Sequence, residues 1–286
     1  MTGLARAVFR NPLGALGALV LVAFVVLGIG GHAWAPYDAT QVDVVTGRLS
    51  GPSTSHWFGT DQLGRDVGSR VLIGTRDALR VAVVAVAVAA AVGSAVGVVA
   101  GYRRGWVDAV LLRCMDVVFA FPAILLAIAV LAVRGPGPNN ATIAIALVYT
   151  PIFARIARAG ALSVRESGYV RAARASGASD RRILWRHVLP NVSGPIIVQV
   201  SLSLAFALLA EAALSFLGLG TQPPNPSWGG MLSDGRDYMQ QAWWMAAFPG
   251  LAIFVVVLSC NLVGDALRDA LDPRERSAVE AAGARS

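Results

Sequence analysis

The chain has 286 residues, of which 56% are hydrophobic and only 14% are charged, well below the roughly 25% charged residues of an ordinary soluble domain. Its 24 basic residues are all arginine and outnumber the 17 acidic residues, giving a formal net charge of +7. This composition excludes a soluble globular enzyme, whose surface must stay largely polar. The lack of lysine excludes a P-loop ATPase and a Schiff-base enzyme.

The cysteine and histidine residues form no recognisable reactive or metal-binding set. Cys114 and Cys260 lie in or beside apolar stretches, which gives neither a disulfide framework nor a cysteine-based zinc site. His32, His56 and His187 are too far apart in the sequence for metal-ligand spacing. We therefore expect no catalytic residue, metal or cofactor in this chain, and no binding of nucleic acid.

Six stretches are apolar enough to cross a membrane, which takes about 20 residues. They cover residues 13–31, 81–102, 117–133, 135–154, 195–217 and 244–264. The third stretch is short and contains Pro122, which predicts a kinked helix, and the fourth is the weakest because it contains several proline and asparagine residues. The sequence thus predicts an all-α, polytopic membrane protein with six transmembrane helices.

The N-terminus resembles a cleavable signal peptide, because Arg6 and Arg10 precede the first apolar run and small residues follow it. The apolar region of a signal peptide is about 7–15 residues long, whereas this run covers residues 13–31. We therefore predict that the segment is retained as an anchor helix.

The distribution of arginine predicts the orientation. With six spans, 17 of the 24 arginines fall on the side that carries both termini and 7 on the other, so both termini are expected in the cytoplasm. Arg70, Arg76 and Arg80 crowd the outer end of the second span, where we expect an amphipathic helix lying on the outer membrane face. Arg113 and Asp116, three residues apart, are expected to neutralise each other.

We divide the chain into an anchor helix with an extracytoplasmic loop (1–78), a core of five spans (79–272) and a polar cytoplasmic tail (273–286). In the outer loop, Asp61, Arg65 and Asp66 are expected to make helix caps and turn contacts rather than a metal site.

The cytoplasmic loop around residues 160–190 is far longer than a connection between two membrane helices needs. Alanine-rich sequence favours a helix before Gly177, which ends it, and Ser179 caps a second helix. Ile183 and His187 then share one face, and Pro190 begins the return into the membrane. A basic amphipathic hairpin of this kind either docks onto a partner or rests on anionic lipid headgroups.

Specific residues of this loop resemble the EAA loop of ABC importer permeases: Ala172-Ala173, Gly177 and Leu189-Pro190. Three further segments resemble the C-type permease of the dipeptide/oligopeptide/nickel branch, namely residues 58–66, residues 214–229 and residues 261–273. Together the resemblance covers residues from about 10 to 275. Two positions depart from the general motif: Arg171 stands where the motif has Glu, and His187 where it has Ile.

The resemblance implies the type I ABC importer permease fold in a bacterial cytoplasmic membrane. It also implies three kinds of protein partner beside the lipid bilayer. They are a homologous B-type permease that completes a heterodimer, two cytoplasmic ATPase subunits that bind ATP and Mg²⁺, and an extracytoplasmic substrate-binding protein. The implied substrates are di- or oligopeptides, with nickel or another small peptide-like solute as the alternative and a secondary transporter as a remote one.

By the same resemblance, the cytoplasmic loop couples to the ATPase. The residues implied are Tyr169, Ala172, Ala173, Gly177, Ala178, Ser179, Asp180, Ile183, His187, Leu189 and Pro190.

Candidates for the translocation path or its gate lie elsewhere. Glu211 is an intramembrane carboxylate, which either lines the path or pairs with a neighbouring arginine or helix end. Ser215, Phe216 and Pro122 are further candidates. The glycine- and proline-rich run that follows residue 214 is expected to form a rigid loop at the outer mouth, which gates the path or receives the delivery protein.

Overall fold

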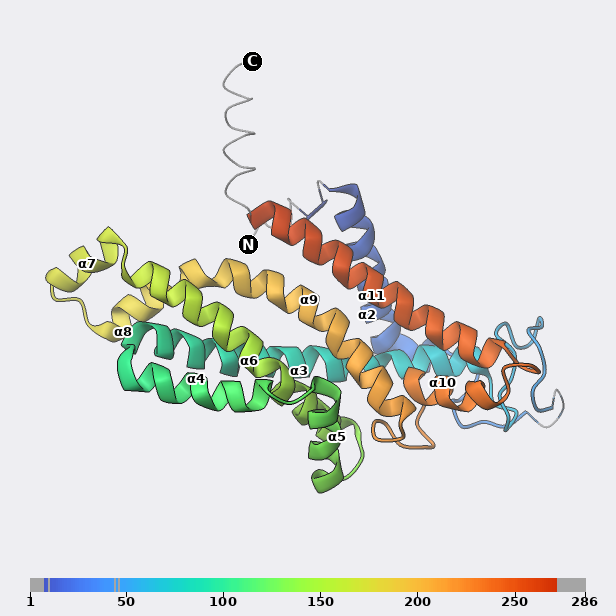
Figure 1. Cartoon of the computed structure of the whole chain (residues 1–286). Coiled ribbons are helices and arrows are strands. Elements are labelled where there is room, and N and C mark those ends of the chain that lie inside the picture. The colour runs from blue at the N-terminus through green and yellow to red at the C-terminus, as the bar shows by residue number, and fades with distance from the viewer. Residues whose placement is uncertain (1–7, 10, 44, 46, 272–286) are drawn as a thin grey trace, which may run out of the picture.

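The computed structural model describes residues 8–9, 11–43, 45 and 47–271, and its named elements are all helices (Figure 1). The membrane-sized helices are α2 (Pro12–Trp34), α3 (Val67–Arg103), α6 (Pro138–Arg165), α9 (Leu189–Phe216) and α11 (Trp244–Leu271). The shorter elements are α4 (Gly105–Phe119), α5 (Ala123–Arg134), α7 (Gly168–Ala175), α8 (Asp180–Ile183), the π-helix η1 (Leu184–Val188) and α10 (Trp228–Asp237). Arg6, Arg10 and the tail 273–286 lie outside the described residues.

The most extensive helix–helix contact in the described structure is between α3 and α6. Gly93, Gly97 and Gly101 recur at every fourth position of α3 and therefore lie on one face. A Cβ atom on Gly97 would collide with the backbone carbonyl of Ala154 in α6, and one on Gly101 would lie 2.6 Å from the carbonyl oxygen of Arg158. Small residues at such positions let helix backbones approach closely in a membrane, where apolar burial alone does not drive association.

Five of the six predicted spans are confirmed as single helices. They are α2, α3, α6, α9 and α11, and each continues past the predicted apolar stretch at one end or both. The weak fourth span exists as α6, with Pro151 inside it. Exposed leucine, valine and isoleucine side chains cover most of α2, whose buried residues are glycines, so this helix presents its apolar surface to lipid.

The second span differs from the prediction because α3 begins at Val67 and continues without a break to Arg103. The prediction of a separate amphipathic helix around Arg70, Arg76 and Arg80 was therefore wrong, because these residues belong to α3. Helix α3 also crosses the domain boundary that we drew between residues 78 and 79. Arg70 is buried, and its Nη1 donates a hydrogen bond to the carbonyl oxygen of Ala39 at 2.7 Å. This tertiary contact explains an arginine that the orientation rule would not place there.

The third span is broken rather than kinked. Helices α4 and α5 meet at 89° across Ala120–Pro122, so the expected single helix over 117–133 was wrong. Proline cannot donate the backbone hydrogen bond that would continue α4. The local pair expected between Arg113 and Asp116 was also wrong, because Asp116 Oδ1 accepts a hydrogen bond from Arg155 of α6 at 2.8 Å.

Charged contacts also hold α4 against α6 at the end of the bundle that carries α7 and α8, which we call the coupling-loop end. Arg158 of α6 makes two hydrogen bonds of 2.6 Å to the two carboxylate oxygens of Asp108. Such two-point contacts fix orientation as well as distance.

At the opposite end, which we call the outer-loop end, the start of α3 packs against α10 and the loop between α2 and α3 packs against α11. The indole of buried Trp228 donates to the carbonyl oxygen of Val71, and that of Trp244 donates to the carbonyl oxygen of Thr60. The predicted turn and cap contacts are confirmed within this loop. Asp66 accepts from the backbone N–H of Ser69 at the start of α3, and Asp61 accepts from Arg65.

The outer loop also contains a buried histidine clamp. His56 is 1% exposed, and its two ring nitrogens lie 2.8 Å from Asp66 and 2.9 Å from Asp43. Burial of the ring lowers the pKa of His56, but its hydrogen bonds to the two carboxylates outweigh that effect and raise the pKa above the ordinary value. Because Asp66 also caps α3, the clamp ties the loop to the start of that helix.

The clamp predicts a specific pH dependence of stability. A raised pKa in the folded state stabilises the fold fully below the unfolded pKa of about 6.5, and this contribution is lost as pH rises through the folded pKa. The melting temperature of the detergent-solubilised protein should therefore contain a component that falls as pH rises from about 6.5.

His56→Ala should remove that component and lower the melting temperature. His32→Ala, at an exposed position in α2, is the matched control and should leave it intact. An unchanged pH profile in His56→Ala would show that the clamp does not contribute to stability.

Candidate functional site

The loop between α6 and α9 is built from two short helices joined at Gly177, as the sequence predicts. Gly177 has φ +80°, and its N–H donates to the carbonyl of Arg174, while the N–H of Ala178 donates to the carbonyl of Ala173. This pair of bonds is a Schellman motif, which ends α7 and needs a residue with positive φ. Ser179 then caps α8, because its side chain accepts from the N–H of Arg182.

A small hydrophobic core supports the loop from beneath. Val170 of α7, Ile183 of α8 and Val188 of η1 are all at most 1% exposed. They pack with residues of α3 and α6, including Tyr102 and Ala161. Ile183, which the resemblance assigns to ATPase coupling, therefore has no exposed surface for a partner and acts by holding the loop in place.

The other residues assigned to the loop are at least partly exposed. Tyr169 and His187 lie together, with ring centroids 5.8 Å apart, although they come from α7 and η1. Trp185, two residues before His187, is 66% exposed. Sequence reasoning missed it, although a tryptophan among arginines in a helical segment is a visible signal. The exposed or half-exposed positions on this surface are Tyr169, Ala172, Ala173, Gly177, Ala178, Ser179, Asp180, Trp185, His187, Leu189 and Pro190.

The sequence predicts that Pro190 begins the return into the membrane, and Pro190 indeed lies in the first turn of α9. Helix α8, η1 and α9 form one continuous helical stretch from Asp180 to Phe216. The π-helical turn of η1 ends two residues before the proline, which has no N–H for the helical ladder. The side-chain amide of Asn191 donates to the carbonyl oxygen of His187 at 2.6 Å. The loop is therefore continuous with a transmembrane helix.

Tyr102, at the end of α3, connects the loop to the bundle. Its hydroxyl donates to Asp180 at 2.6 Å and accepts from Arg174 at 3.0 Å, and its backbone carbonyl accepts from Arg165 at 2.6 Å. One residue thus contacts the ends of α6 and α7 and the start of α8. Sequence reasoning missed it because Tyr102 lies more than 60 residues from these partners.

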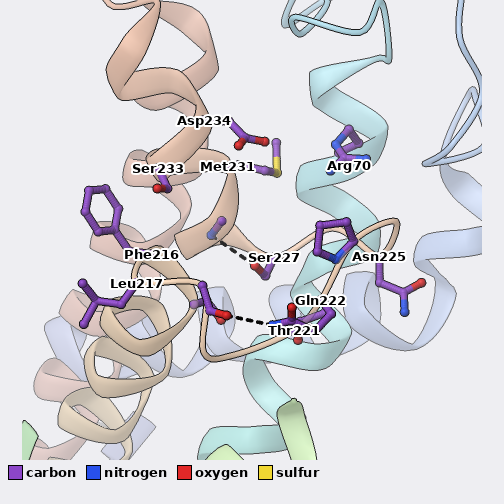
Figure 2. Close-up of a pocket in the computed structure, with 14 residues that line it drawn as sticks. Arg70, Phe216, Leu217, Thr221, Gln222, Asn225, Ser227, Met231, Ser233 and Asp234 are labelled. Atoms are coloured by element: carbon purple, nitrogen blue, oxygen red, sulfur yellow. Dashed lines mark hydrogen bonds between the residues drawn. The ribbon is translucent and has the colours of Figure 1, made fainter. Parts of the chain in front are cut away.

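A polar pocket of about 300 Å³ lies at the outer-loop end of the structure (Figure 2). Arg70 of α3 lies on one side, Phe216 and Leu217 at the end of α9 lie on another, and Met231 and Asp234 of α10 lie above (Figure 2). Its remaining lining includes Ser215, Gly218, Thr221, Gln222, Pro223, Asn225, Ser227, Gly230 and Ser233.

Of the predicted path residues, the structure brings Glu211, Ser215 and Phe216 together. Glu211 is 1% exposed and accepts a 2.7 Å hydrogen bond from Ser215, which lines the pocket beside Phe216. The arginine or helix-end partner that we considered for Glu211 is not what it contacts, and its second carboxylate oxygen has no hydrogen-bond partner in the described structure. Pro122 lies apart, at the break between α4 and α5.

Among the described residues, histidine, cysteine, aspartate and glutamate form no group of three or more with metal-site geometry.

Comparison with known proteins identifies the architecture. A family model described as the inner membrane component of binding-protein-dependent transport systems matches residues 93–277. A structure of the MetNI methionine ABC transporter in an inward-facing conformation is similar, with a TM-score of 0.59 at 17% identity, covering 71% of this chain and 96% of the matched chain. This likeness shows the fold, a type I ABC importer permease.

Curated relatives match nearly the whole chain. A dipeptide transport system permease protein, DppC of Alkalihalophilus pseudofirmus, is 45% identical over 94% of this chain and 88% of its own length. A glutathione transport system permease protein, GsiD of Escherichia coli, is 46% identical over 93% of this chain and 88% of its own. A putative peptide transport system permease protein of Brucella abortus is 46% identical over 94% and 90%.

The contacts of Tyr102 predict that Tyr102→Phe loosens the loop without unfolding the bundle. Losing a hydroxyl that bridges Asp180 and Arg174 should cost about 1 kcal/mol, which corresponds to about fivefold faster amide exchange. Hydrogen–deuterium exchange measured by mass spectrometry should show this increase in residues 168–190.

Tyr149→Phe removes a hydroxyl from the interior of α6 and is the control. It should leave exchange in residues 168–190 unchanged. Equal exchange of this segment in wild type and Tyr102→Phe would contradict the bridging role.

Proposed function

The chain belongs to the family of inner membrane components of binding-protein-dependent transport systems, and on this basis we propose that it is the permease subunit through which an ABC importer moves di- or oligopeptides. The observation that carries the proposal is the loop at residues 168–190: an exposed, basic, helical surface held rigidly on two transmembrane helices. Relatives named for dipeptide, glutathione and peptide transport support a peptide substrate.

The loop acts as the coupling element between ATP hydrolysis and transport. Its exposed side chains contact an ATPase subunit, and its buried Ile183 and Val170 pass the movement of that subunit to α3 and α6. Because α8 continues through η1 into α9, displacement of the loop also tilts a transmembrane helix. A lipid-bound basic patch would explain the arginines but does not need the Schellman turn or the hydrogen bonds to Tyr102.

Partner subunits supply what this chain lacks. Two cytoplasmic ATPases bind ATP and Mg²⁺, since this chain has no lysine with which to build a P-loop. A substrate-binding protein delivers the peptide at the outer-loop end, which faces outside by the distribution of arginine.

A homologous B-type permease covers the break between α4 and α5. Non-helical backbone at membrane depth is tolerated only where protein covers it or where it lines a water-filled path. Phe121 and Pro122 at this break are exposed in the isolated chain. The break therefore faces the partner permease and the translocation path between the two subunits. Pro122, which lies at the break, borders this path.

A second candidate substrate is nickel or another small peptide-like solute. It stays a candidate because the partner permease and the binding protein also take part in selecting the substrate. Nickel bound as a free ion would need ligands, and the described residues hold no group of three metal-ligating side chains, which favours a peptide. A secondary transporter is the remote alternative, and a family relationship to binding-protein-dependent systems disfavours it.

The turn at Gly177 tests the coupling role. Gly177→Val should leave the protein inserted but separate ATP hydrolysis from transport, because a β-branched residue at φ +80° distorts the turn between α7 and α8. No atom lies within 4 Å of a Cβ placed there, so the effect is on backbone conformation and not on packing.

Gly168→Ala is the matched control, since a Cβ at Gly168 also meets nothing within 4 Å and its φ lies outside the positive range. Measurements of the amount in the membrane, ATPase activity and peptide uptake should show normal values for this control. Unimpaired uptake by Gly177→Val would remove the coupling assignment.

Affinity purification tests the whole proposal. The tagged chain in detergent should co-purify with an ATPase whose activity a peptide-loaded binding protein stimulates. Isolation of the chain with no ATPase would reject the importer function and leave the loop as a lipid-facing basic hairpin.

A further inference from the structure

The pocket of about 300 Å³ at the outer-loop end has features of a ligand site rather than of a packing defect. Three parts of the chain meet there: the start of α3, the turn after α9 and helix α10 (Figure 2). Thr221, which lines it, is 7% exposed, and its hydroxyl oxygen has no hydrogen-bond partner in the described structure. A buried polar atom without a partner is costly unless something else satisfies it.

Three other polar side chains of the wall make hydrogen bonds within the protein. Ser215 donates to Glu211, and Gln222 donates to the carbonyl oxygens of Gly218 and Gly220. Ser227 accepts from the backbone N–H of Gly230 as the cap of α10. These bonds hold the wall in shape without a ligand, so the pocket is preformed.

Charges on the wall are of both signs and are not fully paired. Asp61 is shared between two arginines, Arg65 at 2.7 Å and Arg70 at 3.6 Å, which leaves positive charge in excess at this cluster. Asp234 carries the negative charge on α10. It forms no salt bridge among the described residues, although its charge interacts with that of Arg70. A ligand with one positive and one negative group would satisfy both.

The remaining wall is apolar. Phe216 and Leu217 lie together at one side of the pocket, away from Arg70, and Met231 separates Asp234 from the polar floor (Figure 2). Leu217 is 54% exposed, so its apolar side chain is open to contact by a ligand. A pocket with two opposite charges and an apolar side suits a small zwitterion that has an apolar side chain.

We propose that this pocket binds a short peptide with both termini free, with its ammonium group at Asp234, its carboxylate at Arg70, its peptide bond at Thr221, and a side chain against Phe216 and Leu217. The pocket is thus an entry site on this subunit for substrate released at the outer face. This inference rests on the proposed transport function for its biological meaning, but the binding itself requires neither ATP hydrolysis nor a partner.

The test measures protection of a cysteine placed in the pocket. Ser233→Cys, in a full-length chain in membranes with Cys114 and Cys260 replaced by Ser, reacts with a small methanethiosulfonate reagent. The dipeptide Ala-Phe should slow the reaction. N-acetyl-Ala-Phe, which lacks the ammonium, and Ala-Phe amide, which lacks the carboxylate, should protect at least about tenfold less well, as loss of one charge-assisted hydrogen bond predicts.

A matched pair of variants on α10 identifies the residue responsible. Asp234→Asn in the same background should raise the Ala-Phe concentration needed for half-protection by about tenfold or more. Asp237→Asn lies three residues further along and pairs with Arg236 outside the pocket, so it should have no effect.

Equal protection by the capped dipeptides, protection unaffected by Asp234→Asn, or no protection by Ala-Phe would overturn the proposal. If Ser233→Cys does not react, thermal unfolding of the wild-type chain decides, since Ala-Phe and not its capped forms should raise the melting temperature. Protection without any co-purifying ATPase would reject the transport function alone. A stimulated ATPase without protection would reject this pocket alone.

Discussion

The close contact between α3 and α6 is the constraint on which the rest of the structure depends. Gly93, Gly97 and Gly101 allow the two backbones to approach so closely that a single Cβ at Gly97 would displace α6. In a bilayer, where lipid is as apolar as the helix surfaces, this packing replaces the burial that holds a soluble core together. Helices α2, α4, α5 and α9 pack directly on this pair, α4 through Asp108 and Arg158, whereas α10 packs mainly on α9 and α11, and α11 packs mainly on α2 and α9.

Helix α3 runs the length of the bundle, so a single helix contacts both ends of the molecule (Figure 1). At the coupling-loop end, Tyr102 contacts Asp180 and Arg174 of the coupling loop. At the outer-loop end, Asp66 connects it to the histidine clamp and Arg70 lines the polar pocket. The loop and the pocket, for which we propose coupling and ligand binding, are therefore joined by one continuous helix.

Sequence reasoning succeeded where the determinant is local and failed where it is tertiary. The turn at Gly177 and the cap at Ser179 depend on neighbouring residues, and both are confirmed. Arg70 looked like a surface residue because its partner, the carbonyl of Ala39, is 31 residues away. The pocket was only partly predictable, because its wall follows the run expected at the outer mouth, but Arg70 reaches it from a helix that is distant in sequence. Pro122 signalled a disruption of the third span, but the right-angle break follows from how α4 packs on α6.

Amide exchange of the Gly97→Ala variant tests most directly whether the α3–α6 contact holds the coupling loop in place. The added methyl group forces the helices apart in mid-span, far in sequence from the loop. Exchange in residues 168–190 should become faster, whereas Gly250→Ala, whose Cβ meets Leu232 at an ordinary 3.6 Å, should leave it unchanged. Wild-type exchange of the loop in Gly97→Ala would show that the loop is positioned independently of this contact.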